Sequence, residues 1–320
     1  MTYLLFVAGI ALLIKGAQFL VEGSSSIAKH FGIPTIIIGL TVVAFGTSTP
    51  EFFIALLSAL RGTTDIALGN VVGANLLNIL VILGASALVY PLRISRHTVW
   101  KEIPFSLLAA LVLLIIANGS VLGGTGAFSL SRVDGLLLLL FFAIFFYYTL
   151  ELARSQRSRM KLKDIGIEHR SVLASLGLTI LGIAFLWLGG EWVVRGAVHI
   201  AQGLGASTYL IAATVVSIGT TLPELVTSLT AALKKSPGLA VGNAVGSTIF
   251  NVFWILGIAS IIRPIPIPAS VNTDIMFLVF ATLLLFVFMF IGHPKRLDRW
   301  QGLLFVALYL VYLTFVIMRG

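Results

Sequence analysis

Two glutamates lie deep in apolar stretches of the chain, where ionisable side chains are rare. Glu51 ends the segment GTSTPE (residues 46–51), and Glu224 ends the similar segment GTTLPE (residues 219–224). A carboxylate inside a membrane is costly unless something compensates its charge. Carboxylates beside hydroxyl groups are hard oxygen ligands, which suit Na⁺ or Ca²⁺. The pattern therefore favours a cation site over a protonated glutamate that hydrogen-bonds to a neighbouring helix.

A proline precedes each glutamate and is expected to break its helix. Proline lacks an amide hydrogen, and its ring clashes with the carbonyl of residue i−4. Pro50 and Pro223 should therefore free carbonyls near Gly46 and Gly219, and freed backbone is tolerated at membrane depth only where it lines a cavity. The chain has no cysteine, and its five histidines lie outside these segments. This composition argues against a zinc or copper site.

A second motif follows each glutamate segment: GNVVGANLLN (residues 69–78) in one case and GNAVGSTIFN (residues 242–251) in the other. Glycines four residues apart indicate close helix packing. The final asparagines, Asn78 and Asn251, lie deeper in their spans, where an amide needs polar partners. The i, i+4 spacing places Ala74 beside Asn78, and Ser247 beside Asn251, on one helical face. We expect these faces to meet the glutamate segments at the centre of the bilayer.

Both motifs occur twice, at a constant offset of 173 residues. Residues Thr41–Leu60 match Thr214–Leu233 at 10 of 20 positions, and the two asparagine motifs match at 5 of 10. Each half holds five apolar stretches, which is an odd number, so the second half should enter the membrane in the opposite direction. This pattern predicts an inverted-topology repeat, which is typical of secondary transporters.

The composition requires a lipid environment for these elements. Of the 320 residues, 58% are hydrophobic and 10% are charged, whereas soluble domains carry about 25% charged residues. With roughly 20 apolar residues for each crossing, the sequence predicts an all-α polytopic membrane protein with ten transmembrane helices in two inverted-topology repeats of five. The expected units are a first repeat at residues 1–152, a linker at 153–170 and a second, inverted repeat at 171–320.

Basic residues are distributed unevenly between the two sets of loops. One set holds 15 lysines and arginines, including those of the linker, and the other set holds 5. Positive residues stay on the cytoplasmic side, so we expect a cell-membrane protein with both termini outside and residues 153–170 in the cytoplasm. This orientation explains the net charge of +9 better than nucleic-acid binding does.

Taken together, the two motif types resemble the alpha repeats of the sodium/calcium exchangers of the cation/Ca²⁺ antiporter superfamily, in their prokaryotic form. The resemblance covers both repeats and implies Na⁺/Ca²⁺ exchange by alternating access, with helices one and six sliding across the other eight. It also implies a set of ion ligands: the carbonyls of Ala44 and Ser217, and the side chains of Thr47, Ser48, Glu51, Asn78, Thr220, Thr221, Glu224, Ser247 and Asn251.

Two residues depart from the pattern of that family. Ala74 stands where many relatives carry serine, which removes one hydroxyl ligand. Asn251 stands where some prokaryotic and K⁺-dependent relatives carry aspartate, which argues against K⁺ dependence. Two ionised glutamates carry about −2, so one Ca²⁺ or two Na⁺ would neutralise the site, and an empty site should resist reorientation.

Other functions remain open at this level. Desolvation favours the protonated form of a carboxylate, so an antiporter of H⁺ and Ca²⁺, or of another divalent cation, fits the same scaffold. A cation channel would use similar ligands, but inverted repeats with broken helices favour a carrier. An enzyme is disfavoured because the H-E-x-x-H and G-x-S-x-G motifs are absent. We expect no cofactor and no obligate protein partner, only transported Na⁺ and Ca²⁺ and the lipid bilayer.

Overall fold

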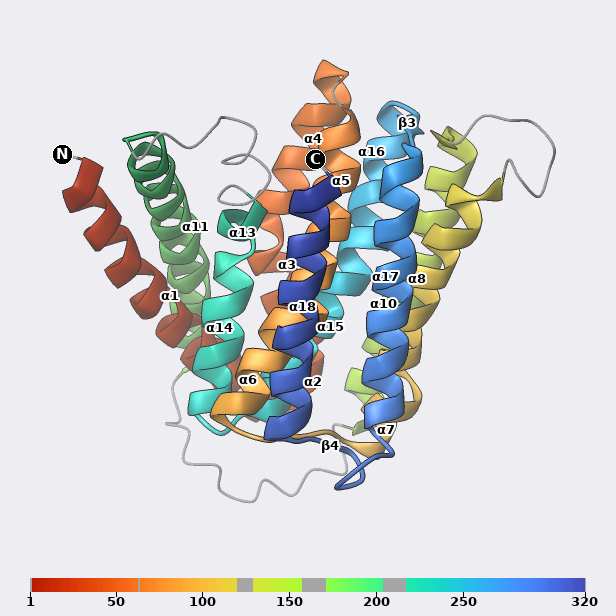
Figure 1. The fold of residues 1–320 in the computed structure, drawn as a ribbon. Coiled ribbons are helices and arrows are strands. Elements are labelled where there is room, and N and C mark those ends of the chain that lie inside the picture. The colour runs from red at the N-terminus through yellow and green to blue at the C-terminus, as the bar shows by residue number, and fades with distance from the viewer. Residues whose placement is uncertain (1, 63, 120–128, 157–170, 204–216, 320) are drawn as a thin grey trace.

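The computed structural model describes residues 2–62, 64–119, 129–156, 171–203 and 217–319, which form a bundle of long helices (Figure 1). Eight helices among these residues are long and apolar enough to cross a membrane, and a bent pair, Thr35–Thr47 with Thr49–Arg61, brings the number to nine. A multi-pass helical membrane fold is therefore confirmed. The remaining predicted span includes residues that lie outside the described part of the chain, so the number ten stays a prediction.

The elements of the two halves follow the same order. The first half contains α1 (Thr2–Phe31), α2 (Thr35–Ile38), η1 (Gly39–Val43), α3 (Ala44–Thr47), α4 (Thr49–Arg61), α5 (Thr64–Leu76), η2 (Leu77–Ile82), α6 (Leu83–Val89), β1 (Leu92–Arg93), α7 (Arg96–Trp100), α8 (Glu102–Ala117), β2 (Ser129–Leu130) and α10 (Arg132–Gln156). The second half contains α11 (Val172–Gly203), α13 (Ser217–Thr220), α14 (Leu222–Leu233), α15 (Pro237–Phe250), η4 (Asn251–Leu256), α16 (Gly257–Ile262), β3 (Ile265–Pro266), α17 (Ala269–Phe288), β4 (Arg296–Leu297) and α18 (Arg299–Arg319).

Some equivalent elements begin at positions related by the sequence offset, and equivalent helices run in opposite directions. Helices α4 and α14 begin at Thr49 and Leu222, and strands β1 and β3 begin at Leu92 and Ile265, which is 173 residues apart in both cases. In Figure 1, α1 descends from the N-terminus whereas α11 ascends, and α5–α6 descends whereas α15–α16 ascends. The duplicated motifs therefore approach one another from opposite ends of the bundle.

Two short strand pairs correct the expectation of an entirely helical chain. Strand β1 pairs with β4, and β2 pairs with β3, in both cases antiparallel. Each pair takes one strand from each half. The residues Leu92, Leu130, Ile265 and Leu297 are fully buried, and buried backbone needs hydrogen-bond partners. Pairing two loop segments supplies those partners, and an apolar pattern read along one loop does not reveal it.

Helices α5–α6 and α15–α16 lie at the centre of the bundle. Within the most apolar 18-residue stretch, 72% of α5–α6 and 78% of α15–α16 is buried. The corresponding share for α18 is 17%. Close packing at the glycines is confirmed for the second half, since a Cβ on Gly242 would lie 2.5 Å from the Ile36 carbonyl oxygen and one on Gly246 would lie 2.8 Å from Leu40 Cα. Around Gly69, no atom of the described residues lies within 4 Å of an added Cβ.

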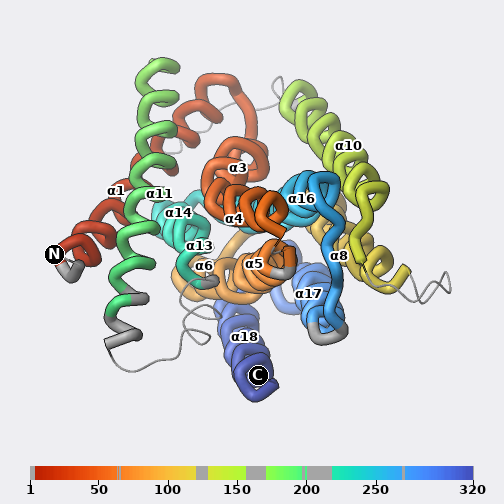
Figure 2. Tube along the Cα trace, turned by 90° about the horizontal axis from the view of Figure 1, so that it is seen from above, coloured from red at the N-terminus to blue at the C-terminus, as the bar shows by residue number. Residues whose placement is uncertain are grey.

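Helices α1 and α11 form a separate layer along one side of the bundle, where Figure 2 shows them crossing. Small residues let their backbones touch: a Cβ on Gly9 would lie 2.9 Å from the Gly189 oxygen, and one on Gly182 would lie 2.5 Å from the Leu20 nitrogen. Ser175 also donates a hydrogen bond to Ser26 at 2.8 Å. The two helices contact each other along their length and the rest of the bundle less extensively.

The turn before α18 is held by a buried carboxylate, Asp298. Burial opposes its ionisation, but hydrogen bonds from His293 (2.9 Å from Nδ1) and from Arg296 Nε outweigh burial and lower the pKa of Asp298. Its backbone N–H donates to Gln301 Oε1 at 2.8 Å. Ionised Asp298 therefore stabilises this turn.

We expect Asp298→Asn to lower the melting temperature of the purified protein at neutral pH. A carboxyl whose pKa is lowered by folding contributes stability above its unfolded pKa, about 3.9 for aspartate, and that stability is lost as the pH falls further. The difference between wild type and variant should thus persist from pH 8 to about pH 5 and narrow only below about pH 4. A difference that is already lost at pH 6 would contradict this role of the ionised carboxyl.

Candidate ion-binding site

Each glutamate sits in the first turn of a helix that restarts after a break. Glu51 lies in α4 and Glu224 in α14, with a proline in the first turn in both cases. The residues before these helices, Ser48 (φ −81°, ψ 10°) and Thr221 (φ −88°, ψ 3°), leave the helical conformation. The first-half pair is bent by 49° at this point. The prolines thus break both helices as the sequence predicts.

The two glutamates meet in the interior of the bundle. Their side chains are buried, with 0% exposure for Glu51 and 1% for Glu224. Ser48 donates its hydroxyl hydrogen to Glu224 Oε1 at 2.9 Å, a contact between residues 176 positions apart. The two glutamate segments therefore lie side by side in the interior, with a hydroxyl of one against the carboxylate of the other.

Two further asparagines link the halves at this level. Thr47 donates to Asn243 Oδ1 at 3.0 Å, and Thr220 donates to Asn70 Oδ1 at 3.3 Å. The two hydrogen bonds are equivalent under the offset of 173. Asn243 also donates to the Glu224 carbonyl oxygen at 3.2 Å and so orients the backbone at the break. Sequence reasoning overlooked this pair, although an asparagine after the first glycine of each second motif was a usable signal.

The asparagines at the ends of the second motifs lie at π-helical turns. Asn78 is the second residue of η2 and Asn251 the first of η4. The η2 turn packs against α14, and the η4 turn packs against α4, so each turn faces the glutamate helix of the other half. Asn251 Nδ2 donates to Asn75 Oδ1 at 3.0 Å. A π-helical turn is rare and often marks a functional site.

Several buried polar atoms of this region have no hydrogen-bond partner among the described residues. They are both carboxylate oxygens of Glu51, Oε2 of Glu224, Oδ1 and Nδ2 of Asn78, Oδ1 of Asn251 and Oγ of Ser247. Leaving a buried polar atom unsatisfied costs about 1–3 kcal/mol, and more if it is charged. Six of the seven atoms are oxygens, so a bound cation would satisfy most of this set at once.

Comparison with known proteins identifies the family. The sequence matches the sodium/calcium exchanger protein family over residues 1–150 and 174–318. This chain belongs to the sodium/calcium exchanger family. It is similar to the putative antiporter CaxA of Alkalimonas amylolytica, with 36% identity over 95% of each chain. It is also similar to the sodium/calcium exchanger MaX1 of Methanosarcina acetivorans, with 25% identity over 98% of this chain and 97% of that one.

The fold is also that of a solved member of the exchanger family. The structure of the sodium-calcium exchanger NCX_Mj soaked with Na⁺ and Sr²⁺ superposes with a TM-score of 0.83, at 33% identity, over 98% of this chain and 97% of that chain. This match of the exchanger-family chain extends over nearly the full length of both proteins. The likeness therefore concerns the whole transmembrane unit.

The other predicted ligands have partners of their own. Thr221 donates to the Ile218 carbonyl oxygen at 3.0 Å. The Ala44 carbonyl oxygen accepts from Ser48 N at 3.0 Å and lies 3.4 Å from the Thr47 hydroxyl. Ser217 begins α13, and only its backbone is described. Ala74 is 1% exposed and takes the place of Ser247 in the first half, so this exchanger-family site has a hydroxyl on one side and a methyl group on the other.

A cavity of about 530 Å³ adjoins the site between α4, α11 and α14. It is lined by Pro50, Gly219, Thr220, Pro223 and Glu191, together with apolar side chains. Glu191 forms an ion pair with Arg195 at 2.7 Å. The cavity reaches the two broken helices of the exchanger fold.

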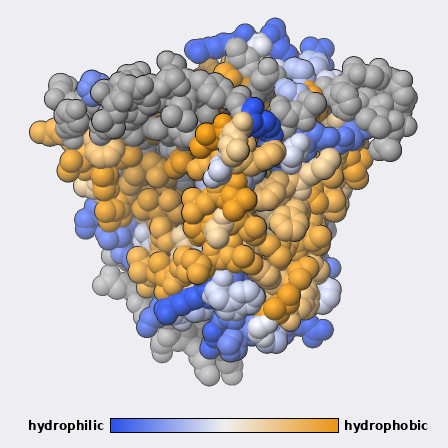
Figure 3. Space-filling view, viewed as in Figure 1, coloured by the Kyte–Doolittle hydropathy of each residue, from blue (hydrophilic) through white to orange (hydrophobic). Residues whose placement is uncertain are grey.

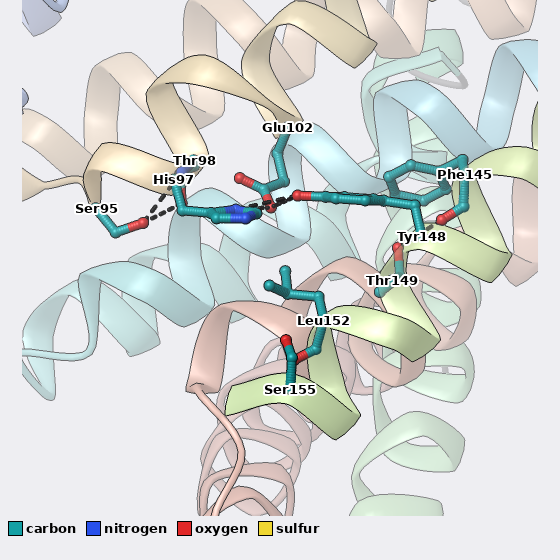
Figure 4. Close-up of polar contacts among 9 residues, drawn as sticks. All are labelled: Ser95, His97, Thr98, Glu102, Phe145, Tyr148, Thr149, Leu152 and Ser155. Atoms are coloured by element: carbon teal, nitrogen blue, oxygen red, sulfur yellow. Dashed lines mark hydrogen bonds and ion pairs between the residues drawn. The ribbon is translucent and has the colours of Figure 1, made fainter. Parts of the chain in front are cut away.

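The exchanger-family chain buries a further carboxylate outside this site. This carboxylate, Glu102, is 1% exposed. Tyr148 donates to Glu102 Oε1 at 2.7 Å, and His97 Nδ1 lies 3.2 Å from the same oxygen (Figure 4). These contacts join α7 and α8 to α10. Glu102 therefore has partners on two elements and belongs to the packing of the outer helices.

Proposed function

We propose that this protein exchanges Na⁺ for Ca²⁺ by alternating access through a single site near the middle of the membrane. The site would consist of Glu51 and Glu224, Asn78 and Asn251, and the hydroxyls and carbonyls of the two broken helices. The observation that carries the proposal is the set of unpartnered oxygens on Glu51, Glu224, Asn251 and Ser247. Membership of the exchanger family supports the same conclusion.

The charge of the site provides the coupling. Two ionised carboxylates carry about −2, and moving uncompensated charge through an apolar barrier is costly. One Ca²⁺ or two Na⁺ would remove that cost, whereas an empty site would keep it. The loaded protein therefore reorients across the membrane, whereas the empty protein resists reorientation. This difference is the condition for coupled exchange rather than uncoupled ion leak.

We further propose that the fold is a pair of inverted repeats with ten transmembrane helices. The repeats would occupy residues 1–152 and 171–320, joined by the cytoplasmic linker 153–170. The offset of 173 residues between α4 and α14 and between β1 and β3, and the opposite directions of α1 and α11, support this arrangement. Most linker residues lie outside the described part of the chain, and both of its flanking helices, α10 and α11, are described.

A transport assay decides between Na⁺ and H⁺ as the driving ion. Protein reconstituted into liposomes would be loaded with Na⁺ and diluted into Na⁺-free medium that contains ⁴⁵Ca²⁺, with a matched set that carries only a pH gradient. We expect rapid uptake with the Na⁺ gradient and near-background uptake with the pH gradient. Uptake driven only by the pH gradient would establish the H⁺/Ca²⁺ alternative, and uptake in the absence of any counter-ion gradient would indicate a channel.

The charge distribution makes a separate prediction about orientation. We expect a cysteine introduced at Ser155, near the end of α10, to react with an impermeant thiol reagent only after the cells are opened. A cysteine at Thr2 should react in intact cells. The chain has no native cysteine, so no background labelling arises from the protein. Labelling at Ser155 but not at Thr2 in intact cells would reverse the orientation.

A further inference from the structure

A basic pocket lies beside β4, at the lower end of the bundle in Figure 1. It has a volume of about 390 Å³ and is lined by Arg93, Ile94, His293, Pro294, Lys295 and Arg296. This volume falls in the usual range for small-ligand sites, about 300–1,000 Å³. Three of the six lining residues are cationic, which is a feature that packing alone does not require.

Two of these cations face each other across a strand pair. In the β1–β4 pair, Arg93 is the direct partner of Arg296. Like charges placed directly opposite in such a pair are destabilising. Arg296 donates through Nε to Asp298, but within the described residues neither Arg93 nor Lys295 has a carboxylate partner. An anion between the strands would remove the repulsion.

The backbone holds the third cation in an unusual conformation. Lys295 has φ of 58° in the left-handed region, which non-glycine residues adopt only where the surrounding structure enforces it. Here its N–H donates to the Met289 carbonyl oxygen at 2.9 Å, and its carbonyl oxygen accepts from Ile94 N at 2.8 Å. The backbone of this lysine is therefore held in place at the pocket.

The pocket lies at the boundary between the apolar band and the polar rim. Figure 3 shows hydrophilic residues along the lower edge of the hydrophobic surface. Trp100 at the end of α7 and Trp300 at the start of α18 are 53% and 51% exposed, and exposed tryptophans mark the level of lipid headgroups. Basic pockets between transmembrane helices at this level suit anionic headgroups.

We infer that Arg93, Lys295 and Arg296 form a binding site for a phosphate group. Guanidinium groups bind phosphate oxygens with two parallel hydrogen bonds, and a lysine adds a point charge. The phosphate belongs either to an anionic phospholipid headgroup or to a soluble phosphate compound. In both cases the ligand ties the loop before α18 to the loop after α6 and so holds together the β1–β4 pair.

The test measures the melting temperature of full-length protein in neutral detergent at constant ionic strength. The probes are dihexanoyl phosphatidylglycerol, dihexanoyl phosphatidylcholine and sodium phosphate. The variants are Arg93→Gln and Lys295→Gln. The control is Lys235→Gln, because Lys235 is also a loop lysine with positive φ, at 55°, and does not line the pocket. A ligand that binds only the folded state raises the melting temperature, and the rise grows with the ratio of ligand concentration to Kd.

We expect wild type and Lys235→Gln to be stabilised equally by at least one of the two anionic probes, phosphatidylglycerol or sodium phosphate. Phosphatidylcholine should stabilise neither protein. Each pocket variant should need at least tenfold more of the probe for the same shift. Without any probe, Arg93→Gln should melt at or above the wild-type temperature, because the substitution removes the repulsion from Arg296. This last readout separates a ligand site from a merely structural arginine.

The probes also identify the source of the phosphate. Stabilisation by phosphatidylglycerol alone assigns the site to lipid, and stabilisation by sodium phosphate as well assigns it to the phosphate group from either source. Failure of both anionic probes to stabilise the wild type would overturn the inference. Equal weakening by Lys235→Gln and Arg93→Gln would also overturn it, since only the net surface charge would then matter.

Discussion

Replacing either buried glutamate by glutamine is expected to reduce Ca²⁺ exchange at least a hundredfold. Glu51→Gln or Glu224→Gln keeps the shape of the side chain but removes half of the negative charge in the site. A Ca²⁺ ion would then leave about +1 in the low-dielectric interior, where an unpaired charge costs several kcal/mol, and each 1.4 kcal/mol is tenfold in rate. The measurement is Na⁺-driven ⁴⁵Ca²⁺ uptake by reconstituted liposomes.

The matched control is Glu191→Gln, which removes the same charge at an exposed position. Glu191 pairs with Arg195 on α11 and is half-exposed, so exchange should stay within about twofold of wild type. Both site variants should fold at least as stably as wild type without Ca²⁺, because an unpaired buried carboxylate destabilises a fold. Near-normal exchange by either Glu51→Gln or Glu224→Gln would remove these carboxylates from the ion site.

Sequence reasoning predicted those parts of the site that depend on a single segment of the chain. Pro50 and Pro223 break their helices because a missing amide and a ring clash act locally. The four-residue spacing of Gly242 and Gly246 indicates close helix packing, although the residues that they contact lie in the other half. In each case the physical cause spans a few residues.

The features that sequence reasoning overlooked depend on contacts between the halves. Asn70 and Asn243 accept hydrogen bonds from threonines of the other half. The sequence of a motif alone does not indicate which residue donates to its asparagine. The π-helical turns at Asn78 and Asn251 lack a sequence signal because π turns obey no simple residue preference. The β1–β4 and β2–β3 pairs join loops from different halves. Such contacts follow from how the two repeats interlock.

The last expectation concerns movement of α1 and α11 against the rest of the bundle. These helices pack closely on each other through Gly9, Gly182 and Gly189, whereas α1 is tied to α14 by a partly exposed ion pair, Lys234 to Glu22 at 2.6 Å. An exposed pair of this kind contributes little stability, about 0–1 kcal/mol. If α1 and α11 slide as a unit during alternating access, this contact must break in each cycle.

Joining α1 covalently to α14 should therefore stop exchange. The double substitution Glu22→Cys with Lys234→Cys, treated with a bifunctional methanethiosulfonate, is expected to lose at least nine-tenths of Na⁺-driven ⁴⁵Ca²⁺ uptake and to regain it after reduction. Recovery on reduction shows that the protein had remained folded. Untreated double variant should transport normally, because the ion pair that it lacks is weak.

The matched control joins the two helices that are expected to move together. Ser26 and Ser175 place their hydroxyl oxygens 2.8 Å apart between α1 and α11, which is close enough for a disulfide after Ser26→Cys with Ser175→Cys. This bond should form on oxidation and leave exchange unchanged. Full exchange with a complete 22–234 cross-link would show that α1 stays fixed to α14, and loss of exchange with the 26–175 disulfide would show that α1 and α11 move separately. Because both cross-links anchor α1 and only their partner helix differs, their comparison isolates the boundary between the moving and the stationary helices.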